Sequence, residues 1–205
     1  MMTPQAFAAD FIRTWEDGGS TDPVKTHSLL REDNGNWTGG KVGSGALVGS
    51  QHGVTPAALA AHRGVTVQKI TLDVMRALTL DEAGQIALGP YYRTPRLDRL
   101  GWNQVTASLF DMAWGAGPVQ AVRLFQRMIE VADDGKIGPA TVGAYQAYLA
   151  ARGLDAVAWE WSFVRARFYA EITKKKPTNL AFILGWLNRT AHFTPDSAWW
   201  GRFAA

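Results

Sequence analysis

Glu16 follows an apolar stretch of the chain and directly precedes a glycine pair, an arrangement that suits a catalytic acid. The apolar residues before it recur at helical spacing and form one face: Phe7, Phe11, Ile12 and Trp15. We therefore expect a helix that ends near Glu16. The glycines that follow, Gly18 and Gly19, allow a ligand or other backbone to approach closely. A carboxyl group held there can donate a proton in general acid catalysis, whereas the plainer interpretation is a solvated glutamate at a helix end.

Hydrolysis of a glycosidic bond needs a proton donor and a second group on the other side of the sugar, and two carboxylates usually fill these roles. Residues 17–53 are rich in glycine and must fold back near Glu16. Asp22 and Asp33 both lie in this stretch, and spacing alone does not choose between them. Asp33 has a structural alternative, because an aspartate two residues before Gly35 can form an Asx-turn.

Three short segments resemble the glycoside hydrolase 108 family of peptidoglycan-cleaving N-acetylmuramidases, found in phages and bacteria. They are residues 16–19 (Glu-Asp-Gly-Gly), 33–35 (Asp-Asn-Gly) and 50–55 (Ser-Gln-His-Gly-Val-Thr). The resemblance implies a fold similar in layout to the phage lysozymes. It also implies Glu16 as general acid, Asp33 as second carboxylate and Ser50 as the hydroxyl that helps to hold water.

The chain departs from this family pattern at three places. Asp17 stands between the glutamate and the two glycines, and His52 occupies a position where the family usually has an aromatic residue. The stretch 36–49 is longer than in the shortest family members, which leaves Thr38 as a rival to Ser50. The candidate substrate contacts in and beside this loop are Asp22, Trp37, Thr38 and His52. A tryptophan can offer a flat face to a sugar ring, although it can equally belong to the core.

A second resemblance lies further along the chain. Residues 125–126 (Phe-Gln) and 134–141 (Asp-Gly-Lys-Ile-Gly-Pro-Ala-Thr) resemble the signature of predicted peptidoglycan-binding domains, and 167–169 and 185–189 resemble the end of the same module. Physically, the signature is a tight turn followed by a helix with proline in its first turn. The alternative is that Asp134 and Thr141 only stabilise this turn.

The remaining pattern predicts a mainly α protein, a lysozyme-like helical fold with a glycine-rich loop or small β region after the first helix. We expect helices at about 3–16, 55–62, 66–72, 79–92, 103–114, 118–131, 139–151, 155–173 and 179–192. The expected division is a catalytic part at 1–110 and a peptidoglycan-binding-like part at 111–205, packed together as one compact unit.

Composition excludes several kinds of chemistry. The chain of 205 residues has no cysteine, so it has no disulfide, thiolate zinc site or thiol nucleophile. Its four histidines show no His-Glu-x-x-His pattern, and its glycines form no phosphate loop or dinucleotide fingerprint. We expect no metal and no cofactor. The net charge of +3 is a weak indication of an anionic partner, and the basic run 174–176 is either a solvated helix end or a contact for an anionic wall polymer.

The first residues carry no basic region, and no apolar stretch approaches the length needed to span a membrane. We therefore expect synthesis in the cytoplasm without a signal peptide, and action on the cell wall after release through a separate export or holin-type route. The expected partner is peptidoglycan, with no nucleic acid and no stable membrane insertion, and the expected state is a monomer.

The sequence thus predicts a hydrolase that cleaves the bond between N-acetylmuramic acid and N-acetylglucosamine. Rival hypotheses are a lytic transglycosylase on the same bond, an amidase or peptidase, and a non-catalytic wall-binding protein. Whether the sugar configuration is retained or inverted depends on the carboxyl separation, which the sequence does not specify.

Overall fold

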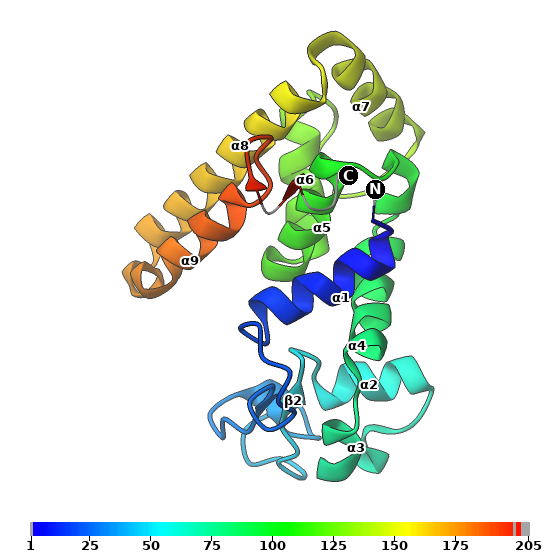
Figure 1. Cartoon of the computed structure of the whole chain (residues 1–205), viewed down its shortest axis with the longest axis vertical. Coiled ribbons are helices and arrows are strands. Elements are labelled where there is room, and N and C mark those ends of the chain that lie inside the picture. The colour runs from blue at the N-terminus through cyan, green and yellow to red at the C-terminus, as the bar shows by residue number, and fades with distance from the viewer. Residues whose placement is uncertain (1, 199, 202–205) are drawn as a thin grey trace. The chain divides into compact units, whose positions relative to one another are not determined.

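The structure is a computed structural model that describes residues 2–198 and 200–201. The chain is mainly helical, as the sequence predicts (Figure 1). The α-helices of the described residues are α1 (Pro4–Trp15), α2 (Pro56–Arg63), α3 (Leu72–Arg76), α4 (Leu80–Leu88), α5 (Gln104–Ala116), α6 (Pro118–Met128), α7 (Pro139–Arg152), α8 (Leu154–Lys175) and α9 (Leu180–Ala191). None of these helices is long and apolar enough to cross a membrane.

Short elements connect the helices. Two strands, β1 (His27–Ser28) and β2 (Ser50–Gln51), pair antiparallel with His27 opposite Gln51 and Ser28 opposite Ser50. The remaining short elements are single turns of 3₁₀-helix or π-helix: η1 (Asn34–Asn36), η2 (Val67–Lys69), η3 (Gly89–Arg93), η4 (Leu97–Leu100) and η5 (Pro177–Asn179). The predicted small β region is therefore one two-stranded sheet within the glycine-rich loop.

The helices begin where capping residues stand in the sequence. The hydroxyl groups of Thr55 and Thr79 accept hydrogen bonds from the first turns of α2 and α4. Asn103 accepts from the backbone N–H groups of Val105 and Thr106 at 3.0 and 3.1 Å and so caps α5. Each cap satisfies helix-terminal N–H groups that have no partner within the helix, so the local sequence sets these boundaries.

Two predicted helices differ from those observed. The stretch predicted as helical at 66–72 is instead the 3₁₀ turn η2, and α3 begins afterwards because the Thr71 hydroxyl accepts from Val74 N–H. The helix predicted to reach about residue 92 ends as α4 at Leu88 and continues as the π-helical turn η3. Pro90 lies at this change, and it has no N–H group to continue the α-helical ladder.

The described residues fall into two compact units by their internal contacts. One unit is Pro4–Gly89, and the other is the described part of 1–3 together with that of 90–205. In the first unit α1 packs along α4, where a Cβ atom at Gly84 would lie 3.3 Å from the backbone nitrogen of Ala9. The two helices therefore approach closely enough that a larger side chain at Gly84 would require a shift of the backbone.

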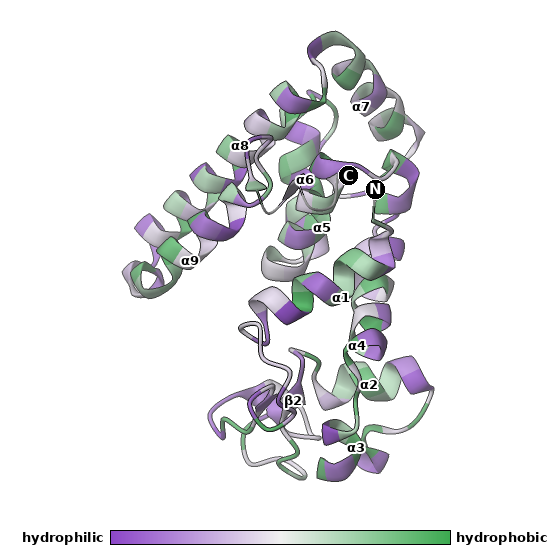
Figure 2. Ribbon diagram, viewed as in Figure 1, coloured by the Kyte–Doolittle hydropathy of each residue, from purple (hydrophilic) through white to green (hydrophobic). Residues whose placement is uncertain are grey.

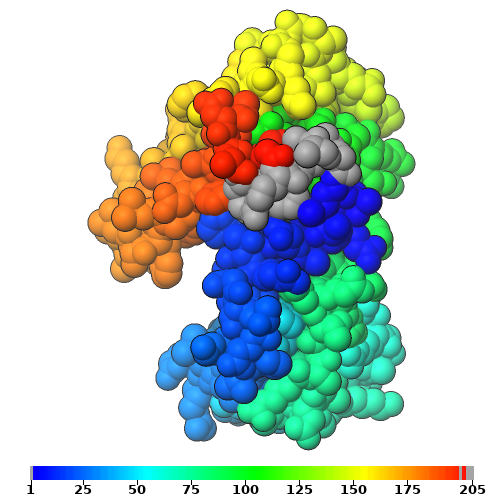
Figure 3. Space-filling view, viewed as in Figure 1, coloured from blue at the N-terminus to red at the C-terminus, as the bar shows by residue number. Residues whose placement is uncertain are grey.

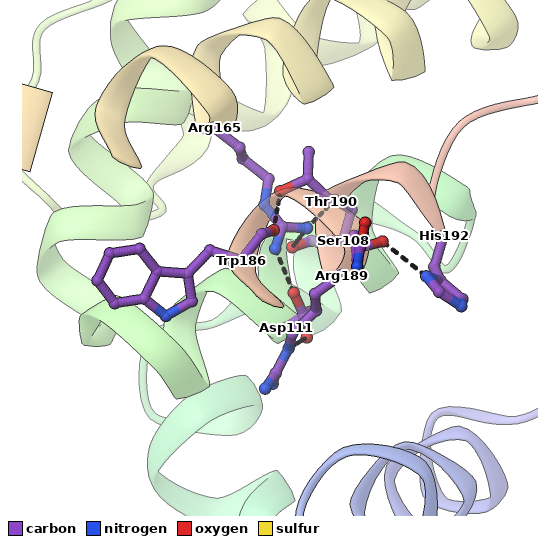
Figure 4. A network of polar contacts seen from close by, with 8 residues as sticks. Ser108, Asp111, Arg165, Trp186, Arg189, Thr190 and His192 are labelled. Carbon is purple, nitrogen blue, oxygen red and sulfur yellow. Dashed lines mark hydrogen bonds and ion pairs between the residues drawn. The ribbon is translucent and has the colours of Figure 1, made fainter. Parts of the chain in front are cut away.

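The second unit has α5 at its centre, with α6 and α8 packed against it. Its core includes an aromatic cluster in which the Phe125 ring lies 5.1 Å from Tyr145 and 5.7 Å from Trp161, both edge to face. A buried ionic cluster joins α5, α8 and α9 (Figure 4). In this cluster Asp111 binds both Arg165 and Arg189.

Candidate active site

Glu16 and Asp17 follow the last residue of α1 and differ sharply in exposure. Both backbone N–H groups bind the carbonyl of Ile12, at 2.9 and 3.1 Å. The chain then turns through Gly18 and Gly19, which have φ angles of 58° and 78°. Glu16 is exposed, whereas the Asp17 side chain is 1% exposed. The predicted acid is thus at the helix end and open to solvent, and its neighbour is the buried carboxyl.

The β1–β2 hairpin presents the second side of the site. At the end of β2, Gln51 and Val54 exchange two backbone hydrogen bonds across a two-residue turn. The central residues, His52 and Gly53, have φ angles of 53° and 71°. Positive φ at both positions is typical of a type I′ turn, in which glycine is favoured at the second position. The turn places His52 beside the end of α1.

His52 and Asp17 form the main polar contact of this site. His52 Nδ1 lies 2.8 Å from the buried Asp17 carboxyl oxygen. With Nδ1 donating to Asp17, the other ring nitrogen can accept from the Gln51 amide at 3.4 Å, and this amide also donates to the Thr26 hydroxyl at 2.7 Å. Burial raises the pKa of Asp17, while its hydrogen bond from His52 opposes that rise. The four side chains form one continuous network.

This network lines a pocket of about 390 Å³ within the first unit. Thr26, Gln51, His52 and Asp17 contribute from the hairpin and from the end of α1. Exposed Arg13 and Arg76 supply positive charge to its wall. The remaining lining residues are Ser20, Thr21, Pro23 and 77–80. A pocket with hydroxyl, amide, carboxyl and guanidinium groups suits a polar ligand such as a substituted sugar.

The structure places the other predicted residues mostly in hydrogen bonds within the loop. Asp33 accepts the N–H of Gly35 at 2.8 Å, which is the Asx-turn geometry, and its side chain is exposed. Asp22 accepts the N–H of Val24 at 2.9 Å. These contacts use one oxygen of each carboxylate.

Three further candidates lie around the hairpin. The Thr38 hydroxyl accepts the N–H of Ala46 at 2.9 Å, and the Trp37 indole N–H donates to the carbonyl of Arg31 at 2.9 Å. Ser50 is half-buried in β2. Of the seven predicted site residues, all of which are described, His52 lines the pocket and the rest lie outside its lining.

Asp17, Gln51 and Thr26 are pocket residues that sequence reasoning did not propose. Asp17 was visible as an extra acidic residue beside Glu16, and His52 as a histidine in an aromatic position. The available signal was that both departures from the family pattern fall in the two segments flanking the loop. Neither departure alone indicates that the two side chains pair.

The peptidoglycan-domain signature in the second unit is built around Gln126. Its amide nitrogen donates to Asp134 at 2.8 Å and to Thr141 at 3.1 Å, while its carbonyl oxygen accepts Gly135 N–H at 2.8 Å. Gln126 is fully buried. Asp134 and Thr141 thus stabilise the turn before α7. A pocket of about 370 Å³, with Arg96 and Lys136 in its lining, lies beside this turn.

Comparison with known families assigns both halves of the chain. Residues 10–117, more than half of the chain, match the profile of Glycosyl hydrolase 108. The chain belongs to the glycosyl hydrolase 108 family. Residues 120–191 of this glycosyl hydrolase match the Predicted Peptidoglycan domain. The order of the two regions is the one predicted from the sequence, and together they identify a peptidoglycan hydrolase.

Among solved structures, the glycosyl hydrolase is similar to that of SagA from Brucella abortus. The two share 23% sequence identity with a TM-score of 0.58, over 95% of this chain and 97% of the other. At this identity the likeness shows a common fold. A search of curated proteins found no match.

Proposed function

We propose that the protein is an N-acetylmuramidase that cleaves peptidoglycan between N-acetylmuramic acid and N-acetylglucosamine. Glu16 protonates the glycosidic oxygen, and Asp33 with a hydroxyl from Ser50 or Thr38 orients the attacking water. The observation that carries this proposal is the match to the glycosyl hydrolase family over the segment that contains these residues. In the same proposal, residues 1–110 act in catalysis and 111–205 in wall binding.

The position of Glu16 supports its role. The carboxyl is exposed at the end of α1, whose apolar face is buried, and it adjoins Asp17, whose side chain lines the pocket. An exposed donor is accessible to a large polymer, and the well-packed α1 helix limits movement of its backbone. A donor fixed in this way can protonate a leaving oxygen, provided that the substrate brings that oxygen within hydrogen-bond reach.

Asp17 is the rival for the role of proton donor. It lies in the pocket, and burial raises its pKa, which favours the protonated form that an acid needs. Its bond to His52 argues for the other assignment, because a carboxylate that accepts from a histidine is already engaged. We assign Asp17 to positioning and Glu16 to proton transfer.

The bond specificity is tested by digesting purified peptidoglycan and identifying the new chain ends by mass spectrometry. A muramidase leaves reducing N-acetylmuramic acid ends. Anhydro-sugar ends would instead identify a lytic transglycosylase, and new amino groups an amidase or peptidase. Binding without any new ends would show a wall-binding protein that has lost catalysis.

The assignment of the acid is tested by Glu16→Gln, which keeps the size and hydrogen bonding of the side chain but has no transferable proton. We expect a loss of turnover of about 10²-fold or more, with wall binding retained, because a positioned general acid contributes about that much. Glu32→Gln, an exposed change in the same loop, is the matched control and should be as active as wild type. Peptidoglycan turbidity gives the rate, and circular dichroism checks the fold.

Two companion variants separate the alternatives. Full activity of Glu16→Gln together with inactive Asp17→Asn would transfer the acid role to Asp17. Asp33→Asn keeps an oxygen that can accept from Gly35, so a drop in its activity reports on the lost charge rather than on the turn.

A further inference from the structure

An apolar face of α9 is open to solvent in the second unit. It consists of Leu180, Leu184 and Leu187, which are 65%, 73% and 37% exposed. We call these three residues the α9 face. Leu180, Leu184 and Leu187 recur at helical spacing and so share one side of the helix. Figure 2 shows apolar residues along α9, and this orange segment is at the surface in Figure 3.

The opposite side of α9 is already used for packing. Its Trp186 ring stacks on Tyr169 of α8 with centroids 5.1 Å apart. Arg189 binds the buried Asp111 at 2.5 Å. The two helices run side by side in opposite directions (Figure 1). The α9 face is thus a second apolar surface on an anchored helix, in addition to the one that holds it to the protein.

Positive charge flanks this apolar face. Lys174, Lys175 and Lys176 are all exposed at the end of α8, and η5 leads from them directly into α9. Glu171, the nearest preceding acid, is paired with Arg167 at 3.0 Å. Between residues 172 and 195 the sequence has four lysines or arginines and no aspartate or glutamate. The helical hairpin formed by α8 and α9 therefore combines exposed apolar side chains with a local excess of positive charge.

These two properties match one kind of surface. We propose that the α8–α9 hairpin binds peripherally to a bilayer that contains anionic phospholipids, with the α9 face in contact with the acyl boundary and residues 174–176 at the phosphates. Exposed leucines beside clustered lysines are typical of helices that lie in the membrane interface. Such binding would hold the hydrolase where the membrane adjoins the wall.

Two other occupants fit less well. An anionic wall polymer satisfies the lysines but offers no hydrocarbon against which the leucines can be buried. In a symmetric contact between two copies, the α9 faces could cover each other, but the contact would give the lysines no anionic partner. A bilayer surface satisfies both features at once.

Co-sedimentation of the full chain with vesicles tests the proposal. We expect binding to vesicles of phosphatidylcholine mixed with phosphatidylglycerol, weaker binding to phosphatidylcholine alone, and release at high salt because the lysine contribution is screened. Equal binding to both compositions at every salt concentration, or no binding to either, would overturn the proposal.

Two sets of variants separate the contributions of charge and hydrocarbon. Changing residues 174–176 to glutamine should lower the partition coefficient by at least about tenfold, since each lysine contributes several-fold. The matched control changes three exposed lysines of the first unit, Lys25, Lys41 and Lys69, to glutamine and alters net charge equally. An equal loss in this control would show that only overall charge matters and would contradict a site on the hairpin.

The hydrocarbon contribution is tested by Leu180→Ser with Leu184→Ser, against the exposed pair Val24→Ser with Val42→Ser as control. Only the α9 variant should lose vesicle binding. If wild type instead formed concentration-dependent dimers and did not bind vesicles, and if the α9 variant abolished these dimers, the α9 face would be a self-association surface. Retention on purified wall alone would identify a polymer site. Glu16→Gln should bind vesicles as wild type does, so this proposal and the muramidase proposal can fail separately.

Discussion

Asp17 and His52 are residues at which this chain departs from the pattern of the family it resembles, and their side chains contact each other. Their pairing joins the end of α1, immediately after Glu16, to the turn beyond β2. Because the two side chains are 1% and 12% exposed, loss of either one leaves a buried polar partner unsatisfied. We therefore interpret the Asp17–His52 contact as one that fixes the position of the backbone next to Glu16.

A double-mutant cycle measures this coupling. Asp17→Ala and His52→Ala should each lower the free energy of unfolding by about 1–3 kcal/mol, and the double variant should lose less than the sum. Any strain from alanine at the positive φ of residue 52 is present in both the single His52→Ala variant and the double variant, so it cancels in the coupling energy. The matched control is the exposed Arg167–Glu171 pair, for which we expect a coupling of about 0.5 kcal/mol or less. A coupling no larger than that at Asp17–His52 would contradict the interpretation.

The β1–β2 hairpin depends on a close approach that only glycine allows. A Cβ atom at Gly49, whose φ is 76°, would lie 2.4 Å from the carbonyl of Ser28 and 2.7 Å from the His27 ring. His27 Nε2 is 3.0 Å from the Val48 carbonyl, so this nitrogen carries a hydrogen and donates it. The ring thus joins β1 to the segment that leads into β2, and burial lowers the pKa of His27, helped by the charge of Arg76.

This lowered pKa predicts a pH dependence of stability. Below pH roughly 6.5, the ordinary pKa of histidine, the unfolded chain takes up a proton that the folded hairpin resists. The His27 contribution to stability is therefore fully present above that pH and is lost as pH falls toward the lower folded pKa.

Chemical denaturation between about pH 7 and pH 5 should show this loss in wild type and a smaller loss in His27→Gln, whose amide can still donate to Val48. His62→Gln, at an exposed histidine in α2, is the control and should follow wild type. Parallel pH profiles for wild type and His27→Gln would show that His27 is not responsible.

At the scale of the whole molecule, the chain combines a glycosyl hydrolase 108 region with a Predicted Peptidoglycan domain. The second unit contains the most deeply buried charges of the described residues. Asp111 and Arg165 are both fully buried at the side chain, and Arg189 is 16% exposed. Arg165 also donates to the Ser108 hydroxyl at 2.7 Å. These contacts connect α5, α8 and α9, so they hold the helix that carries the α9 face (Figure 4).

Breaking this cluster should be costly. Asp111→Leu leaves Arg165 buried without its carboxylate, and we expect a loss of about 3 kcal/mol or more in the free energy of unfolding. Adding Arg165→Met should recover much of that loss, because the fully buried charge is then removed, while Arg189, which is 16% exposed, still reaches solvent. Asp133→Asn, in an exposed ion pair of the same unit, should change stability little. Denaturant unfolding gives these values, and no recovery in the double variant would show that the cluster contributes more than charge compensation.

Most helices could be predicted from the sequence because their signals are local. Threonine and asparagine caps, first-turn prolines and Gly64 at the end of α2 all act within one turn of the backbone they satisfy. The exceptions are the 3₁₀ turn η2 and the π-helical η3, where several local conformations compete and packing selects one. The candidate site was less predictable, since only His52 among the seven predicted residues lines the pocket.

The sequence by itself determined the helical class, the family resemblance, the order of the catalytic and wall-binding regions and the position of Glu16 at a helix end. Only the tertiary structure decided that Asp17 is buried and pairs with His52, that Gln126 organises the turn at Asp134, and that the α9 face is left exposed. The reason is physical. Caps and helical periodicity act over a few residues, whereas burial and pairing join groups 35 residues apart in the case of Asp17 and His52.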